Sequence, residues 1–237
     1  MIVVRDKAEL LRLIDQRIKK QGPNCNLNDI DVSKIDDMSG LFYDSKFNGD
    51  ISEWNVSRVR SMSSMFTGSR FNGSISRWDV SNVEDMDAMF ARTRFNRDIS
   101  NWNVGKVKNM HFMFANSRFD GDISKWDVSN VKVMSYMFWN SRFSGDISEW
   151  DTSSVEHMVG MFEESRFNKD ISKWDVSKVE DMSYMFYRSQ FNGDISNWNV
   201  SNVEYMECMF LNSMFTGDIS RWDLSNVVDT ELERSGS

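Results

Sequence analysis

The stretch from Trp78 to Ser100 reads WDVSNVEDMDAMFARTRFNRDIS, and after one variable residue the pattern restarts at Trp102. Eight of the nine tryptophans recur at intervals of 24 residues, at positions 54, 78, 102, 126, 150, 174, 198 and 222. A fixed period of roughly 20–50 residues is typical of chains built from stacked repeats. The 237-residue chain is therefore expected to be one array of like units and not two independent globular domains.

Within one unit the apolar pattern changes its period. Trp78 and Val80 alternate with polar neighbours, which predicts a short strand. From Val83 to Phe90 the apolar residues are spaced three, three and one apart, which predicts a short helix with Ser81 as its N-cap. We therefore expect an α/β repeat: a right-handed solenoid of 24-residue strand-turn-helix units, with a parallel sheet on one face and short helices on the other.

The two ends of the chain depart from this pattern. Residues 1–22 are expected to form an N-terminal capping helix, because Asp6 to Lys20 is amphipathic and Gly22-Pro23 ends it. Residues 23–229 are expected to form one solenoid of eight to nine repeats, and residues 230–237 a truncated end with a linker or tag. Thr230 stands where methionine is expected, so this uncapped end predicts homo-oligomerisation through the C-terminal end.

The unit Ile-x-x-Trp-Asp-Val-Ser-x-Val-x-x-Met-x-x-Met-Phe-x-x-Ser resembles the repeats of BspA-like leucine-rich-repeat bacterial surface proteins, also called Mycoplasma-lipoprotein-type repeats. The resemblance covers nearly all of residues 24–229. It implies a leucine-rich-repeat-like solenoid, bacterial surface display and adhesion, and it implies no catalytic residues. Tryptophan stands where many leucine-rich repeats carry leucine or isoleucine.

Composition and motifs argue against several function classes. The net charge of -8, with both signs interspersed, does not favour nucleic acid as a partner, and no apolar run is long enough for membrane insertion. Met1 is not followed by a signal peptide, so the chain is expected to be cytoplasmic as written, and secreted or displayed on the cell surface if a leader was removed. His111 and His157 stand at different columns without neighbouring ligands, and we expect no enzyme activity, no cofactor and no metal.

Two charged columns run through the repeats, four residues apart. One reads Lys46, Arg70, Arg94, Arg118, Arg142 and Arg166, followed by Gln190 and Met214; the other reads Asp50, Ser74, Asp98, Asp122, Asp146, Asp170, Asp194 and Asp218. The first interpretation is a reciprocal ladder of ion pairs and hydrogen bonds, and the second is an anion-binding arginine stripe. The column of residue 77, which alternates in sign, predicts charge pairing across the sheet.

Aromatic residues outside the core columns gather on one expected outer face, that of the helices. They fall in the columns of residues 61, 64 and 67, and the candidate contacts are Phe112, Tyr136, Trp139, Tyr184, Tyr187 and Tyr205. A uniform scaffold with a variable, aromatic-bearing face is how repeat proteins build binding surfaces. The leading hypothesis is a non-catalytic scaffold that binds a protein or a surface polysaccharide. The alternatives are a purely structural or spacer solenoid, or an engineered scaffold, that self-associates through its C-terminal end.

Overall fold

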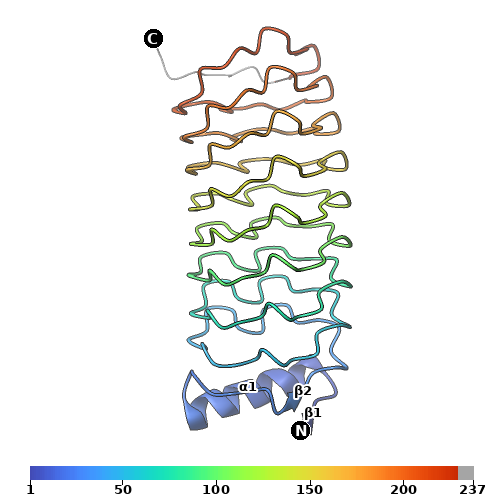
Figure 1. Ribbon diagram of the computed structural model, residues 1–237, viewed down its shortest axis with the longest axis vertical. Coiled ribbons are helices and arrows are strands. Elements are labelled where there is room, and N and C mark those ends of the chain that lie inside the picture. Colours follow the sequence, from blue (N-terminus) through green and yellow to red (C-terminus); the bar gives the residue numbers. More distant parts are fainter. Residues whose placement is uncertain (229–237) are drawn as a thin grey trace.

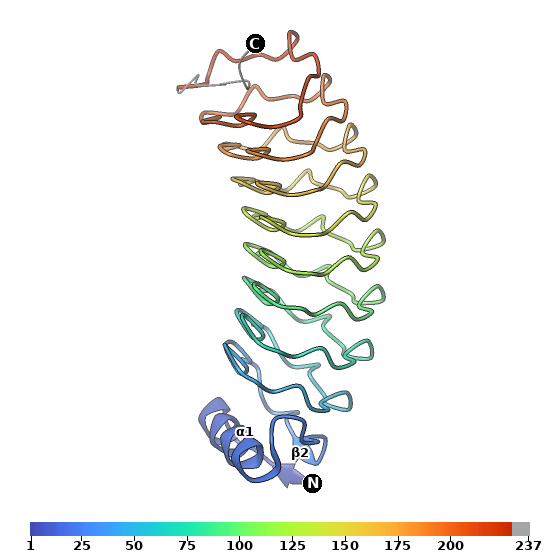
Figure 2. The ribbon, with the colours of Figure 1, turned by 90° about the vertical axis from the view of Figure 1, so that its left-hand side faces the viewer.

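Each 24-residue unit makes one turn of a coil, and successive turns lie side by side along the long axis of the molecule (Figure 1). The structure is a computed structural model in which residues 1–228 are described. The predicted truncated end and linker, with Thr230, lie outside the described residues. The turns differ little in shape from one another, as Figure 2 shows from the side.

The N-terminal end carries the regular elements of the described chain: β1 (Ile2–Val3), α1 (Lys7–Gln21) and β2 (Ile30–Asp31). β1 and β2 pair in parallel. The carboxylate of Asp6 accepts a hydrogen bond from the backbone N–H of Glu9 at 2.8 Å and caps α1. Gly22, with a φ of 87°, follows the helix and donates its N–H to the carbonyl of Ile18. This helix lies across the first turn, close to the range that the sequence predicts.

The predicted α/β fold class is wrong for the repeats. Between residues 32 and 228 the described chain contains neither helices nor extended strands; it forms turns joined by isolated parallel bridges. These bridges run between equivalent residues of adjacent turns, from Asp37 and Ser61 through to Asp181 and Tyr205. The bridged column lies within the stretch where the pattern predicts a helix, whereas the predicted strand at residues 78–80 takes part in tight turns. The expected sheet face and helix face therefore do not exist.

Backbone dihedral angles explain why no helix forms. The columns of residues 64 and 68 both have positive φ, with values of 54° at Ser64 and 66° at Gly68. A residue with φ in this region at the third position is typical of a type II turn, and it interrupts a right-handed helix. Hydrogen bonds from Met65 to Met62 and from Ser69 to Phe66 close two such turns in succession. A three-residue spacing of apolar side chains fits consecutive turns as well as it fits a helix.

The backbone donors in this segment divide their hydrogen bonds between two partners. The N–H groups of Met62, Ser64, Phe66 and Gly68 donate to carbonyls of the next turn, at 2.7–3.0 Å. The intervening N–H groups donate within their own turn. A helix would keep every bond inside one unit. Here half of them join neighbours, so the segment from residue 60 to residue 68, which we call the ladder segment, couples each turn to the next.

The interior is filled by the columns that repeat in the sequence. The isoleucine, tryptophan, valine, methionine and phenylalanine columns are buried from turn to turn. Each indole of the main tryptophan column donates its Nε1–H to a carbonyl of the preceding turn, as Trp126 does to Ile99 at 3.2 Å. Adjacent indoles stack with their centroids 6.4–6.5 Å apart. The prediction that these side chains fill the coil is confirmed.

The spacing of the turns differs between the two sides of the coil. On the tryptophan side the repeat distance is 6.4–6.5 Å. Chains joined by parallel-bridge hydrogen bonds lie ~4.8 Å apart. The stack of turns bends gently, as Figure 2 shows.

Candidate binding surface

The ladder segment presents the variable columns of residues 61, 63, 64 and 67 outward. Of the six aromatic residues predicted as contacts, five are half-buried and one, Tyr205, is 45% exposed. The structure brings them together in two clusters. The first contains Phe112, Tyr136 and Trp139, and the second Tyr184 and Tyr187. Tyr205 makes no ring contact with either cluster in the described chain.

The rings of the first cluster are held by one another. Phe112 stacks on Tyr136 with the centroids 4.9 Å apart and the planes inclined by 10°. Trp139 meets both rings edge-on, at 6.1 and 6.4 Å. Such pairs contribute about 0.5–1.5 kcal/mol beyond the area that they bury. The indole Nε1 of Trp139 is buried without a hydrogen-bond partner among the described residues, which is costly for a polar group.

The backbone at these rings is unusual. Phe112, Tyr136 and Tyr184 have φ values of 52°, 56° and 60°, in a region that bulky side chains rarely occupy. The same column holds Gly40 and Gly160, the residue type that suits it best. Left-handed backbone costs about 1–2 kcal/mol for a residue with a side chain. The chain therefore places three of its outward aromatic side chains at positions that carry a backbone cost.

Gly160 accommodates the ring of Tyr136. A Cβ at Gly160 would overlap Cε1 of Tyr136, so any other residue would displace the phenol. Burial is the main reason that the pKa of Tyr136 is raised, with smaller contributions from the charges of Glu163 and Asp181. Glu163, close to this glycine, also has a raised pKa, chiefly through its own burial. The phenol thus lies over the next turn and does not extend into solvent.

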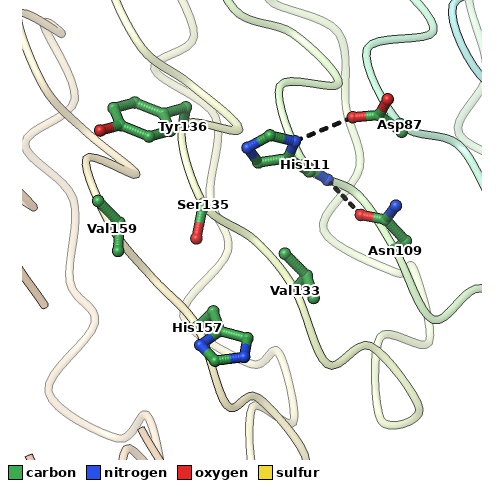
Figure 3. A pocket seen from close by; sticks show the side chains of 8 residues that line it. All are labelled: Asp87, Asn109, His111, Val133, Ser135, Tyr136, His157 and Val159. Carbon is green, nitrogen blue, oxygen red and sulfur yellow. Dashed lines mark hydrogen bonds and ion pairs between the residues drawn. The ribbon is translucent and has the colours of Figure 1, made fainter. Parts of the chain in front are cut away.

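Beside this cluster the ladder segment is hollowed. The hollow has a volume of about 480 Å³, and its lining residues come from four successive turns (Figure 3): Asp87, Asn109, His111, Val133, Ser135, Tyr136, His157 and Val159. His111 and His157 border it from different turns. The wall combines an aromatic ring, two aliphatic side chains and several hydrogen-bonding groups. That combination of an apolar surface with a few placed polar groups is typical of binding sites.

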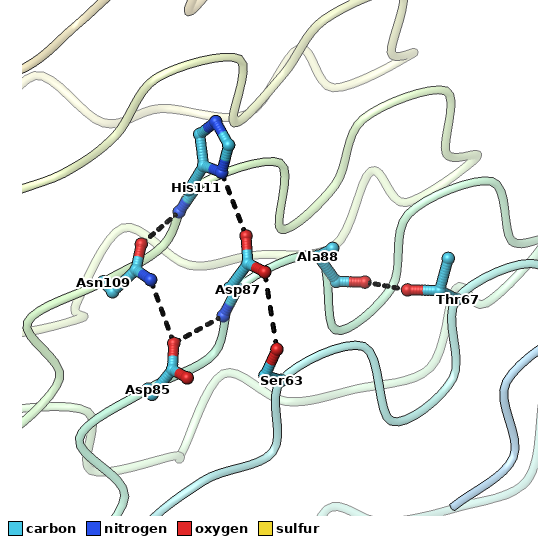
Figure 4. A network of polar contacts seen from close by, with 7 residues as sticks. All are labelled: Ser63, Thr67, Asp85, Asp87, Ala88, Asn109 and His111. Atoms are coloured by element: carbon cyan, nitrogen blue, oxygen red, sulfur yellow. Dashed lines mark hydrogen bonds and ion pairs between the residues drawn. The ribbon is translucent and has the colours of Figure 1, made fainter. Parts of the chain in front are cut away.

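The polar side of the hollow is a connected network (Figure 4). Nδ1 of His111 lies 3.0 Å from Oδ1 of Asp87, and Asp87 also accepts a hydrogen bond from the hydroxyl of Ser63 at 3.4 Å. The amide of Asn109 donates to Asp85 at 3.0 Å, and its oxygen accepts the backbone N–H of His111. His111 is therefore oriented by a carboxylate that stands 24 residues earlier in the sequence.

This network was not predicted from the sequence. His111 was expected to have no neighbouring carboxylate, because Asp87 is remote along the chain. The 24-residue period could have revealed this contact, because residues 24 apart lie in adjacent turns and Asp87, His111, Ser135 and Val159 occupy one column. No cluster of three or more metal-ligating side chains occurs among residues 1–228.

The second cluster lies two turns further along. The phenol of Tyr184 donates a hydrogen bond to Oε1 of Glu207 at 2.7 Å. This bond is the first cause of the raised pKa of Tyr184, followed by burial and the charge of Glu207. The guanidinium of Arg188 lies 4.9 Å from the ring centre of Tyr187, within the range of a cation–π contact. This cluster is more polar than the first.

The charged columns differ from the ladder of ion pairs first predicted. Among residues 1–228 no ion pair joins the arginine column to the aspartates from Asp50 to Asp194. The column of residue 77 does pair across turns, with Arg77 3.8 Å from Glu53 and Lys173 2.6 Å from Glu149. Further inter-turn pairs lie in the column of residue 60, where Glu84 meets Lys108 at 2.8 Å. The predicted pairing therefore occurs, in part, on the column of residue 77.

Comparison with known proteins identifies a family. A family model described as "Mycoplasma protein of unknown function, DUF285" matches residues 15–118, 70–166 and 140–233, which overlap and span most of the chain. Comparisons with curated proteins and with solved structures give no match. Within the described part of the chain no helix is long and apolar enough to cross a membrane.

Proposed function

Since the chain belongs to the Mycoplasma repeat family DUF285, we propose that this repeat protein is a non-catalytic scaffold that binds a macromolecule, either a protein or a surface polysaccharide. The contact surface is the cluster of Phe112, Tyr136 and Trp139 with the adjoining hollow. The proposal extends to kinship with BspA-like surface proteins and to display on a bacterial surface, since the repeat unit that suggested both spans the whole array.

One observation carries the proposal. Phe112 and Tyr136 stand at positive φ, on the column where glycine occurs twice, and both are only partly buried. Packing inside the coil does not explain why these two positions are aromatic, because neither side chain belongs to the interior columns. Positive φ in this column belongs to the turn that each repeat makes, so the specific feature is that bulky aromatic side chains occupy it in consecutive turns and line a surface. Aromatic side chains are the groups that most often dominate the energy of an interface.

The test uses the one tryptophan that stands on this surface. Eight indoles are buried in the coil, so fluorescence quenching by acrylamide reports chiefly on Trp139. We expect one member of a panel of soluble bacterial polysaccharides, or of a panel of purified extracellular proteins, to protect Trp139 from quenching. Tyr136→Ala should abolish that protection while the protein remains folded. Tyr43→Ala is the matched control, because Tyr43 is 53% exposed and lies outside both clusters.

A structural or spacer array is the second candidate, and the uniform stacking of every turn favours it. The same variants separate the two functions. If Tyr136→Ala and Trp139→Ala only lower the melting temperature and no probe protects Trp139, the aromatic cluster is packing and the binding proposal fails. End-to-end association through the C-terminal end is a further part of the spacer proposal, and a monomeric mass by light scattering at high concentration would contradict it.

A further inference from the structure

A row of cations runs along the outside of six successive turns. Its members are Lys46, Arg70, Arg94, Arg118, Arg142 and Arg166, and all six are exposed. The phenylalanine that follows each of them is buried, and these rings repeat at 6.1–6.4 Å, which fixes the spacing of the row. None of the six forms an ion pair or a side-chain hydrogen bond with another described residue. Neighbouring cations in this row are closer together than one Debye length, so dissolved salt screens their mutual repulsion only in part.

A row of carboxylates runs beside it at the same spacing. Asp98, Asp122, Asp146, Asp170 and Asp194 are exposed, and each accepts a hydrogen bond from the backbone N–H of the serine two residues later. From Arg118 to Asp122 exposed and covered residues alternate, with Phe119 buried and Asp120 exposed. The strip therefore presents three outward columns, cation, polar residue and carboxylate, and Arg97 and Lys169 add an exposed cation directly before the carboxylate in two turns.

The two rows do not neutralise each other within one chain. Among residues 1–228 the ion pairs involve other side chains, and no member of the cation row pairs with a carboxylate from Asp98 to Asp194. The two rows of opposite charge therefore run parallel to each other at a fixed lateral distance. A linear polyanion could follow the cation row, but the neighbouring carboxylates would repel it. A partner that carries both rows at this lateral distance and this spacing would use both at once.

We propose that the arginine and aspartate columns form a face on which two copies of this chain associate side by side. A two-fold axis parallel to the long axis exchanges the two columns and keeps each turn at its own level. Arg118 of one copy then meets Asp122 of the other, and Asp122 of the first meets Arg118 of the second. Arg94 with Asp98 and Arg142 with Asp146 repeat the contact one turn away. The two copies have the same spacing by necessity, so the match does not degrade along the row.

The polar column lies on this axis, where each residue meets its own copy. Oδ1 of Asn96 and of Asn168 accepts a backbone N–H of the next turn, and the side-chain NH2 of each can donate across the axis to the amide oxygen of its copy, which has a second lone pair. Asp120 instead meets the Asp120 of the second copy, and two like charges at that distance oppose association. The arrangement therefore predicts that removing the charge of Asp120 strengthens association and that removing the charge of Asp122 weakens it, whereas the net charge of -8 alone would make both changes favourable.

Sedimentation velocity at low ionic strength, over a concentration series, tests the proposal on the full chain. We expect a reversible dimer that dissociates as salt is raised, and R118E should weaken the dimer at least about tenfold, because each copy loses an ion pair and gains a repulsion. R118E/D122R should restore it. R118E/D170R has the same net charge and should remain weak, because residue 170 meets residue 166. D120N should tighten the dimer.

Several outcomes would overturn the proposal. A single monomeric species at about 0.1 mM protein and low salt is one, and equal behaviour of the matched and mismatched charge exchanges is another. If the chain is monomeric and binds polyaspartate or heparin in a manner that R118E abolishes, the cation row serves a polyanion instead. Far-ultraviolet circular dichroism of each variant separates loss of association from loss of folding. A dimer that ignores all of these substitutions would point to the C-terminal end.

Discussion

The substitution Gly160→Ala separates the cost of positive φ from the cost of displacing Tyr136. The methyl group would overlap the phenol ring that lies over Gly160. Gly40 occupies the same column with a φ of 65°, and a Cβ added there would have no atom within 4 Å, so Gly40→Ala is the matched control. Both variants incur about 1–2 kcal/mol for alanine in the left-handed region. Only Gly160→Ala also incurs about 1–3 kcal/mol for overpacking.

We therefore expect Gly160→Ala to melt about 2–12 °C below Gly40→Ala, at about 2–4 °C per kcal/mol for a chain of this size. The displaced phenol also loses its stacking on Phe112, so acrylamide should quench Trp139 more readily in Gly160→Ala alone. Differential scanning calorimetry and fluorescence quenching of both variants measure the two effects. Equal melting temperatures, with unchanged quenching in both, would refute the packing of Tyr136 on Gly160.

Hydrogen bonds at three sites lead to further predictions. Trp126→Phe leaves the buried carbonyl of Ile99 without its donor, and urea unfolding should show a loss of about 1–3 kcal/mol or more. The pKa of the Tyr184 phenol is raised, so the phenol stabilises the folded state below its unfolded pKa near 10, and this stability is lost as pH rises through the folded pKa. Glu207→Gln removes the hydrogen-bond acceptor and should lower the pKa of Tyr184. An absorbance titration, with Tyr184→Phe as the reference, measures this change. Hydrogen bonds from Ser124 lower the pKa of Asp122, so the stability that this carboxylate provides is present above pH ~4 and lost as pH falls through the folded pKa. In Asp122→Asn this contribution to the pH dependence of the melting temperature should be absent.

The sequence predicted the stacking of the candidate aromatic residues only in part. It placed Phe112, Tyr136 and Trp139 on one outward face, and the structure brings these three together. It also grouped them with Tyr184 and Tyr187, which form a separate cluster because Gly160 interrupts the aromatic column between the two. The pairing of Asp87 with His111 depends on contact between adjacent turns, and a search for ligands along the chain does not detect it.

The 24-residue period by itself determined which side chains fill the coil and which point outward, because a buried position in one turn must be buried in the next. The period also placed like residues in columns, which is why the charged rows could be identified before the structure. Only the tertiary structure decided the backbone conformation. The spacing between Val83 and Phe90 fits a helix and a pair of consecutive turns equally well. The chain forms consecutive turns because half of their N–H groups can then donate to carbonyls of the neighbouring repeat. These bonds exist only when repeats are stacked, so the sequence of a single unit does not reveal them.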